Sequence, residues 1–232
     1  MNKLNTYVIL RNDKYKKVLI GFPGTKEILQ LISEAINSDQ VSGDLKKLDK
    51  NILFNSYDYV RAKSLMEIIF SSENKKNMKL NEGYQIIFTG HSLGGAMASI
   101  TALLALDRDY IKKSLNHPVV ITFGQLRTGN EAFAKALMQN TEVVFRVTNT
   151  KDVVPQVPLF SDNYRHPNGR IIIEGNEQSY SIQGNTFNYE INKINDVQEM
   201  NSFEILKTIV TDIKRHLFYF KIQVGQYCKN NN

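Results

Sequence analysis

The sequence has few of the residues that cross-link, interrupt or anchor a chain. Its only cysteine is Cys228, so no disulfide can form within the chain. Its 5 prolines and 13 glycines are too few for a low-complexity protein. No apolar stretch approaches the roughly 20 residues of a membrane span, so we expect no transmembrane segment. The fold must therefore be stabilised by its own packed core.

The beginning of the sequence also lacks the features of a signal peptide. It has neither the long apolar run nor the small-residue cleavage site that such a leader requires. The compartment stays open at this point, between the cytoplasm and secretion of a chain from which the leader is absent.

Length and composition predict one globular domain over residues 1–232. Hydrophobic residues make up 42% and charged residues 22%, as in ordinary folded proteins. A chain of 232 residues can bury one sizeable core but is short for two domains. The net charge is +6, yet the lysines are scattered and no arginine-rich stripe or nucleic-acid motif is present. We therefore expect a solvated basic surface and no nucleic-acid partner.

The hydrophobic pattern predicts alternating strands and helices. We expect strands at residues 7–10, 18–22, 84–89, 119–123 and 142–148, and helices at 26–37, 58–70 or onward to 79, 93–106 and 130–139. A β-ribbon is expected at 171–174 and 179–182, and a final helix at 202–220, whole or broken near residue 216. Apolar strands separated by helices indicate a parallel sheet that is covered on both faces. Functional residues in such a sheet follow the carboxyl ends of the strands.

The strongest motif is the segment Gly-His-Ser-Leu-Gly at residues 90–94, which has the G-x-S-x-G pattern of a nucleophile elbow. This pattern is informative only between a strand and a helix, and both are predicted here. The flanking glycines allow a turn that larger side chains would block, and Gly95 keeps the following helix close to the sheet. The sequence therefore predicts Ser92 as a nucleophile held in a strained turn.

A serine nucleophile needs a base that takes its proton and an acid that orients the base. In this type of enzyme the chain order is Ser, then Asp or Glu, then His. Asp152 follows the predicted strand 142–148 in a loop stiffened by Val-Val-Pro, and it is the favoured acid. Asp162, in a softer stretch, is the alternative.

Two histidines fit the position of the base. His91 and His117 precede both acids, so the chain order makes them structural residues. His166 lies directly before the turn into the predicted ribbon, whereas His216 lies near the end of the last large element. Position alone favours His216, because a base after the last strand can reach over the elbow, but His166 stays open.

Several segments together resemble the class 3 lipases, the fungal triacylglycerol lipase-like family of α/β-hydrolases. The segments that carry the resemblance are 90–96 (GHSLGGA), 121–130 (ITFGQLRTGN), 146–158 (RVTNTKDVVPQVP), 164–166 (YRH) with Glu174, and 216–220 (HLFYF). Their order and spacing match the family from about residue 18 to residue 220. The resemblance implies an α/β-hydrolase fold, with a mostly parallel central sheet and helices on both faces.

The resemblance also implies a role for several residues. The family's catalytic histidine lies in the H-x-x-Y-F segment, which makes His216 the base and His166 structural. The triad is then Ser92, Asp152 and His216. One oxyanion donor should be the amide of Leu93, directly after the nucleophile. The other follows the family's F-R-G segment, which corresponds to Thr25 here.

The sequence departs from the family at a few points. Pro23 stands where the family has arginine, and Leu126 replaces the proline before Arg127. The family's V-H-x-G-F entry to the helix before the elbow strand is not visible. In lipases of this family a lid follows the oxyanion loop, and the predicted helix 26–37 occupies that place. It is interpreted either as a lid or as a helix packed on the core.

The activity implied is hydrolysis of a carboxylic ester, with a triacylglycerol as the substrate in lipid degradation. It proceeds through an acyl-enzyme and requires no metal or organic cofactor. The partner is a lipid or ester substrate at a lipid–water interface. The alternatives are a phospholipase, a galactolipase or a short-chain esterase, and, in a different class, a catalytically silent lipid-binding protein on the same fold.

Overall fold

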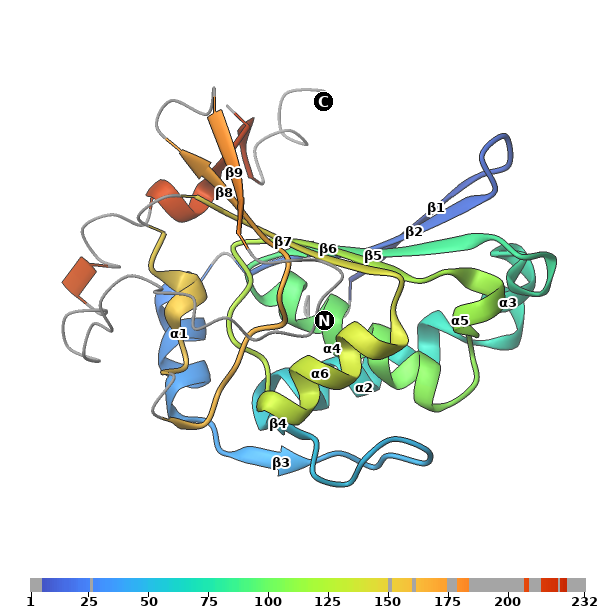
Figure 1. Ribbon diagram of the computed structural model, residues 1–232, viewed down its shortest axis with the longest axis horizontal. Helices are drawn as coiled ribbons and strands as arrows, with labels where there is room; N and C mark the ends of the chain where they lie inside the picture. Colours follow the sequence, from blue (N-terminus) through green and yellow to red (C-terminus); the bar gives the residue numbers. More distant parts are fainter. Residues whose placement is uncertain are drawn as a thin grey trace.

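The computed structural model describes residues 6–25, 27–149, 152–159, 162–174, 179–183, 207–208, 214–220 and 222–224. Within these ranges, seven strands form the main sheet in the order β1-β2-β5-β6-β7-β8-β9 (Figure 1). The strands are β1 (Val8–Asn12), β2 (Lys17–Phe22), β5 (Gln85–His91), β6 (Val119–Phe123), β7 (Val143–Asn149), β8 (Arg170–Glu174) and β9 (Ser179–Gln183). The five inner strands are parallel, and the outer β1 and β9 are antiparallel to their neighbours. The mostly parallel sheet expected from the sequence is therefore present.

The helices are α1 (Ile28–Asn37), α2 (Ser56–Ile69), α3 (Ser72–Asn77), α4 (Leu93–Asp107), α5 (Lys113–Asn116) and α6 (Glu131–Asn140). Two short antiparallel pairs, β3 (Gln40–Ser42) with β4 (Leu53–Asn55) and β10 (Phe218–Tyr219) with β11 (Ile222–Gln223), were not predicted. Short 3-10 turns lie at η1 (Leu80–Glu82) and η2 (Val154–Gln156). None of the helices in the described ranges is both long enough and apolar enough to cross a bilayer.

The helix predicted at 58–70 corresponds to α2. It does not continue toward 79, because Ser71 caps the start of α3 by accepting a hydrogen bond from the amide of Asn74. The final element was predicted as a helix over 202–220, whole or broken near residue 216. Residues 214–217 are helical, but the chain then enters β10. Most of the predicted range 202–220 lies outside the described residues.

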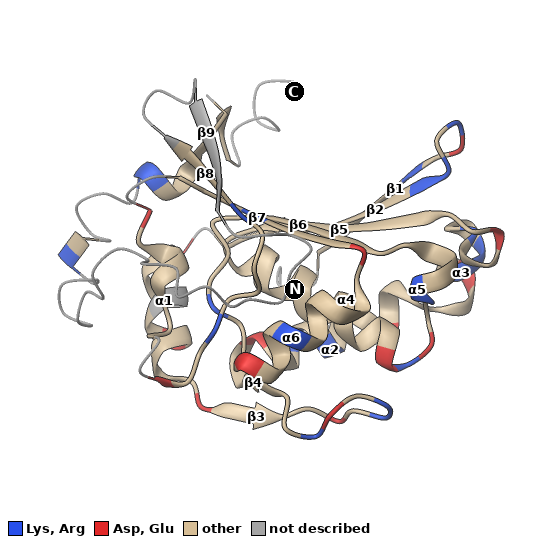
Figure 2. Cartoon of the chain, in the orientation of Figure 1, with Lys and Arg blue, Asp and Glu red and all other residues tan. Residues whose placement is uncertain are grey.

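The core lies between the sheet and the helices α2, α4 and α6, which Figure 1 shows together on one face. Side chains of β5 alternate between half-buried and buried, with Ile86 and Phe88 fully buried toward this core. α4 is buried almost along its whole length, and its small residues allow it to pack directly on the strands. The charged side chains lie mainly in the outer helices and turns (Figure 2).

A second, smaller cluster joins the end of the chain to the sheet. It contains Val147, Ile173 and Tyr219, with Phe123 and Val224 packed against it. Phe123 and Val147 are the last apolar residues of neighbouring parallel strands, where they are paired in register. The segment 214–224 is therefore held at the carboxyl edge of the sheet, which is where functional residues are expected.

Asp58, in the first turn of α2, is a buried acid outside this edge. Its side chain is fully buried, and neither carboxylate oxygen has a hydrogen-bond partner among the described residues. Burial raises the pKa of Asp58 to about 7, and the charge of Arg61 opposes this only in part. The folded protein therefore binds a proton here that the unfolded chain releases near its ordinary pKa of 3.8.

We predict that Asp58→Asn stabilises the protein in a pH-dependent way. Because the folded-state pKa is raised, the wild type loses stability as the pH rises from about 4 to about 7, and the loss is complete above that range. The variant has no such charge, so its advantage should grow over this interval to at most about 4 kcal/mol. Urea unfolding at about pH 4 and about pH 8 measures this difference. An equal effect of the substitution at both pH values would show that Asp58 does not titrate in this way.

Candidate active site

Ser92 lies in the tight turn between β5 and α4, where the nucleophile was predicted. Its φ is 57° and its ψ is −125°, which is an unfavourable conformation for a residue with a side chain. A Cβ at Gly90 would lie 2.2 Å from the carbonyl group of Gly94, and one at Gly94 would lie 2.2 Å from the carbonyl oxygen of Phe22. The two glycines are therefore required by contact between backbones, and that contact fixes the turn.

Asp152 and His216 are brought together from positions 64 residues apart in the chain. His216 Nδ1 donates to Asp152 Oδ2 at 2.9 Å, and both side chains are buried. The other carboxylate oxygen, Oδ1, accepts from the amide of Val154 at 3.0 Å. Because Nδ1 is engaged, Nε2 is the nitrogen left for a proton from another group.

Two side-chain atoms of the predicted triad are buried without a partner. They are Oγ of Ser92 and Nε2 of His216, and neither has a hydrogen-bond partner among the described residues. Buried polar atoms are normally paired, and unpaired ones occur at catalytic sites. The pairing of these two atoms with each other, or with a substrate, would complete a Ser-His-Asp relay.

Tyr219 is a residue of the site that the sequence analysis missed. Its hydroxyl donates to Asp152 Oδ2 at 2.9 Å, the same oxygen that His216 contacts. Burial, together with the negative charge of Asp152, raises the pKa of Tyr219 well above its usual value, so the hydroxyl keeps its proton. Its position in the H-x-x-Y-F segment is the signal that could have pointed to it.

His91 contacts His216 and not a carboxylate. Its Nε2 donates to the carbonyl oxygen of His216 at 2.7 Å, and the two rings are tilted by 36° with centroids 4.4 Å apart. Burial, with a smaller contribution from His216, lowers the pKa of His91 to about 4, so it is neutral at neutral pH.

Gly124 also lies against the ring of His216. Its φ is +55°, and a Cβ there would lie 2.8 Å from Cε1 of His216.

The predicted oxyanion donors are next to the elbow. Leu93 is the first residue of α4, where backbone amides have no partner within the helix. The loop after β2 passes over the turn, since a Cβ at Gly24 would lie 2.9 Å from the carbonyl oxygen of His91 and 3.6 Å from Cβ of Ser92. Thr25 follows directly, and its hydroxyl accepts from the amide of Glu27 at 3.1 Å.

The alternative acid and base are placed differently. Nε2 of His166 donates to the carbonyl oxygen of Pro155 at 2.8 Å, not to a carboxylate. Burial and the charges of Arg146 and Arg127 hold the pKa of His166 well below its usual value, which makes it a poor base. Asp162 is exposed, whereas Asp152 is buried against His216.

We predict that Tyr219→Phe lowers kcat on a soluble ester about tenfold with little change in KM. The lost hydroxyl leaves one lone pair of Asp152 unsatisfied, and hydrogen bonds to charged groups contribute about 1.5–3 kcal/mol. Tyr164→Phe is the matched control, because Tyr164 is also buried but its hydroxyl accepts from Asn55 instead. Equal kcat values for the two variants would argue against a role for Tyr219 in holding Asp152.

Comparison with known proteins places this chain in a family. Residues 19–161 match the model of the class 3 lipases. The chain is 29% identical over 230 residues to a lipase of Rhizopus niveus, covering 97% of this chain and 53% of that protein. It is 30% identical over 143 residues to a secreted mono- and diacylglycerol lipase of Fusarium solani, covering 61% of this chain and 39% of that protein. The chain thus spans about half, or less, of the length of these curated relatives.

Solved structures agree on the fold. The triacylglyceride lipase of Rhizomucor miehei superposes with a TM-score of 0.71 at 23% identity, covering 94% of this chain and 77% of that one. Lipase II of Rhizopus niveus gives 0.71 at 24% identity, covering 94% and 76%. The α/β-hydrolase fold expected from the sequence is therefore confirmed. Since the family model covers most of the chain, the protein belongs to the class 3 lipase family.

Proposed function

We propose that this protein hydrolyses carboxylic esters of acylglycerols through an acyl-enzyme formed on Ser92. The observation that carries this proposal is the buried Asp152–His216 pair, whose free Nε2 lies at the same sheet edge as the unpaired Oγ of Ser92. A neutral imidazole with one nitrogen fixed by a carboxylate is the arrangement that activates a serine. The proposed chemistry requires no metal or organic cofactor.

In the first half of the proposed reaction, Oγ of Ser92 attacks the ester carbonyl while its proton passes to Nε2 of His216. Asp152 holds Nδ1–H and stabilises the resulting cation, with Tyr219 and the amide of Val154 satisfying the carboxylate. His216 then gives the proton to the departing alcohol. In the second half, His216 takes a proton from water as the water oxygen attacks the carbonyl of the acyl-serine. The bond from the acyl carbon to Oγ then breaks, His216 returns the proton to Oγ of Ser92, and the carboxylic acid is released.

The negative oxygen that forms in each half needs backbone donors. We assign this role to the amides of Leu93 and Thr25. Leu93 begins α4, so its amide points out of the helix and lies at the positive end of the helix dipole. Thr25 is held near the elbow by the close approach of Gly24 to His91 and Ser92. Pro23 has no amide hydrogen and cannot be a donor.

The substrate class is supported by the relatives. One is named a mono- and diacylglycerol lipase, and one structural neighbour a triacylglyceride lipase. We infer that the ester is met at a lipid–water interface, and α1 directly follows the loop that carries Thr25. The last turn of α1 is fixed, because Ala35 is buried and its carbonyl oxygen accepts from Asn55. Leu29, in the first turn, is 52% exposed. Any movement of α1 as a lid would therefore start from its first turns.

We predict that a fluorophosphonate probe labels the wild-type protein and that Ser92→Ala abolishes labelling. Phosphonylation requires an activated serine, so His216→Ala should also lose it, by about 10³-fold or more in rate. His166→Ala is the matched control and should still be labelled, since His166 contacts Pro155 rather than the triad. The rate of labelling, followed by gel fluorescence, gives the comparison.

Two results would contradict the proposed function or its assignment of residues. A folded wild type that does not react would show that the protein is not a serine hydrolase. Loss of labelling in His166→Ala with retention in His216→Ala would exchange the two histidines and remove His216 as the base. Circular dichroism of each variant shows whether it is folded.

A further inference from the structure

The end of the described chain forms an exposed apolar hairpin directly after the catalytic base candidate. We call it the terminal hairpin; its described residues are β10 (Phe218–Tyr219), Phe220 and β11 (Ile222–Gln223). Phe218 is 42% exposed, Phe220 53% and Ile222 52%, whereas Tyr219 between them is buried against Asp152. One hairpin therefore holds the site together on its inner side and presents large apolar side chains to solvent on its outer side.

The conformation of Phe220 is unfavourable for its residue type. Its φ is +50°, in the left-handed region that favours glycine and asparagine. Seven non-glycine residues of the described ranges have positive φ, and Phe220 is the only one with an apolar side chain. Its ring lies edge-on to that of Phe123, with the two ring centroids 6.4 Å apart, but Phe220 is still about half exposed. A turn that needed only stability would carry Asn or Gly here, so the phenylalanine points to contact with something outside the fold.

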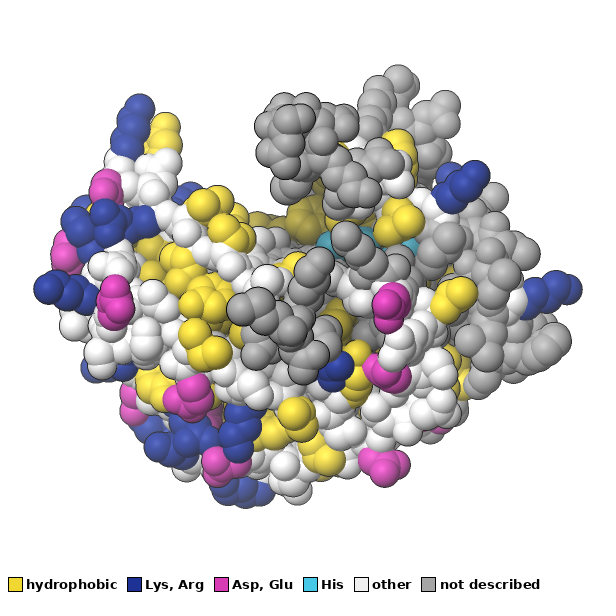
Figure 3. All heavy atoms as spheres, turned by 180° about the vertical axis from the view of Figure 1, so that it is seen from behind, with side chains coloured by type: hydrophobic (Ala, Val, Ile, Leu, Met, Phe, Trp, Pro, Cys, Tyr) yellow, Lys and Arg dark blue, Asp and Glu magenta, His cyan; other side chains and the backbone are white. Residues whose placement is uncertain are grey.

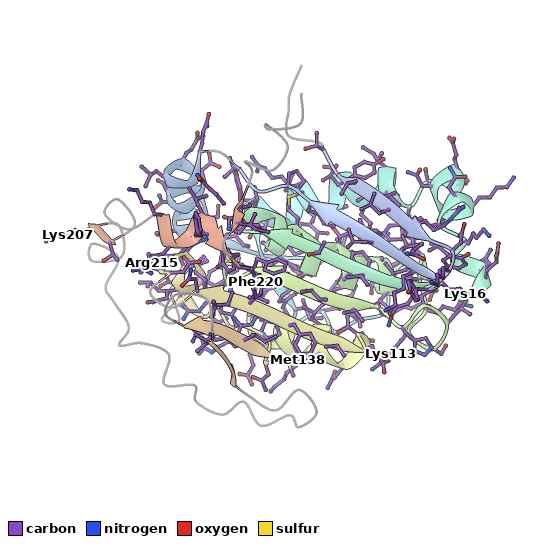
Figure 4. All side chains as sticks on the ribbon, turned by 90° about the horizontal axis from the view of Figure 1, so that it is seen from above. Lys16, Lys113, Met138, Lys207, Arg215 and Phe220 are labelled. Carbon is purple, nitrogen blue, oxygen red and sulfur yellow. The ribbon has the colours of Figure 1, made fainter. Side chains whose placement is uncertain are left out.

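Basic residues lie next to the exposed apolar side chains of the terminal hairpin. Lys214 and Arg215 are exposed and lie on the helical turn that enters the hairpin. From residue 214 to residue 232 the sequence contains Lys214, Arg215, Lys221 and Lys229, and no aspartate or glutamate. Figure 4 shows Arg215 and Phe220 in the same half of the molecule, with Lys16 at the opposite end of the sheet. Aromatic residues flanked by lysine and arginine are typical of segments that lie in the interface of anionic membranes.

We propose that the terminal hairpin docks the protein onto an anionic lipid surface. Phe218, Phe220 and Ile222 would enter the boundary between headgroups and acyl chains, while Lys214 and Arg215 contact the anionic headgroups. Because His216 lies between the cations and the aromatic residues, docking brings the lipid to the base itself. The face seen in Figure 3 has histidine side chains beside hydrophobic ones, with basic side chains near them. The reason for docking rests on the proposed function, but the docking itself does not.

A second copy of the chain is a less suitable occupant. Three half-exposed side chains present roughly 300 Å² of apolar surface, given that large side chains bury about 150–250 Å² each. A stable protein interface needs about 800 Å² from each partner. A lipid surface has no such lower limit, because a few inserted side chains and cations suffice for reversible binding.

The test is sedimentation of the Ser92→Ala protein with vesicles, so that binding is measured without hydrolysis. Vesicles of phosphatidylcholine with phosphatidylserine should bind the protein more tightly than phosphatidylcholine alone. Phe220→Asn should weaken binding to the mixed vesicles at least about fivefold, since it removes a large apolar contact. Lys214→Gln combined with Arg215→Gln should weaken it about tenfold or more on mixed vesicles, with little effect on phosphatidylcholine alone.

Two controls distinguish a loss of lipid binding from a loss of folding. Asparagine is favoured at positive φ, so Phe220→Asn should not lower the thermal unfolding midpoint. Tyr15→Asn is the matched control, because Tyr15 is 63% exposed and lies between Lys14 and Lys16, in the turn between β1 and β2. It should bind like the parent protein. Equal binding by the Phe220→Asn and parent proteins would overturn the proposal, as would self-association without lipid that depends on Phe220 in sedimentation velocity.

Activity is scored separately, on protein with Ser92 intact. The loss caused by Phe220→Asn should be larger on substrate dispersed in anionic micelles than on soluble p-nitrophenyl butyrate. A wild type that binds mixed vesicles through Phe220 but hydrolyses neither substrate would refute the proposed function and leave the docking surface standing. A wild type that hydrolyses the soluble ester but binds vesicles independently of Phe220 would refute the docking surface and leave the proposed function standing.

Discussion

The contact on which the site depends is the approach of three backbones where β5 turns into α4. Gly90 lies against Gly94, and Gly94 lies against Phe22, at separations that leave no room for a Cβ. Parallel pairing of β2 with β5 holds these segments together, from Lys17 with Gln85 to Phe22 with Gly90. Strain of about 1–3 kcal/mol in the turn is sustained by that surrounding structure. The same contact sets the direction of Ser92, the start of α4 and the loop that carries Thr25.

A buried carboxylate then joins the two distant parts of the chain. Burying a charge is costly unless it is fully hydrogen-bonded. Asp152 receives three donors, from His216, Tyr219 and the amide of Val154, so its charge is satisfied within the protein. The contrast with Asp58, equally buried but without such donors, explains why Asp58 binds a proton near neutral pH. Asp152 contacts both His216 and Tyr219, so the proposed catalysis and the proposed docking depend on the same segment of the chain.

Many strands and the nucleophile elbow could be predicted from the sequence. The strand Val119–Phe123 has the predicted bounds because its apolar run is short and delimited. The elbow was predicted because the glycines flank Ser92 between a predicted strand and a predicted helix. Contacts between distant segments could not be predicted. The H-x-x-Y-F segment could have pointed to Tyr219, but neither its bond to Asp152 nor the contact of the His91 ring with His216 follows from sequence spacing, because each depends on tertiary packing. The exposure of Phe220 was not predicted for the same reason, since the range 202–220 was expected to be helical, whole or broken near residue 216.

The central claim is that Ser92 forms the covalent intermediate. The most direct measurement is acid quenching of the protein during turnover of p-nitrophenyl butyrate, followed by mass spectrometry of its peptides. We expect a butyryl group on the peptide that contains Ser92, and accumulation of that group when release by water is slower than acylation. Steady hydrolysis with no acyl group on this peptide, or with the acyl group on another residue, would contradict it.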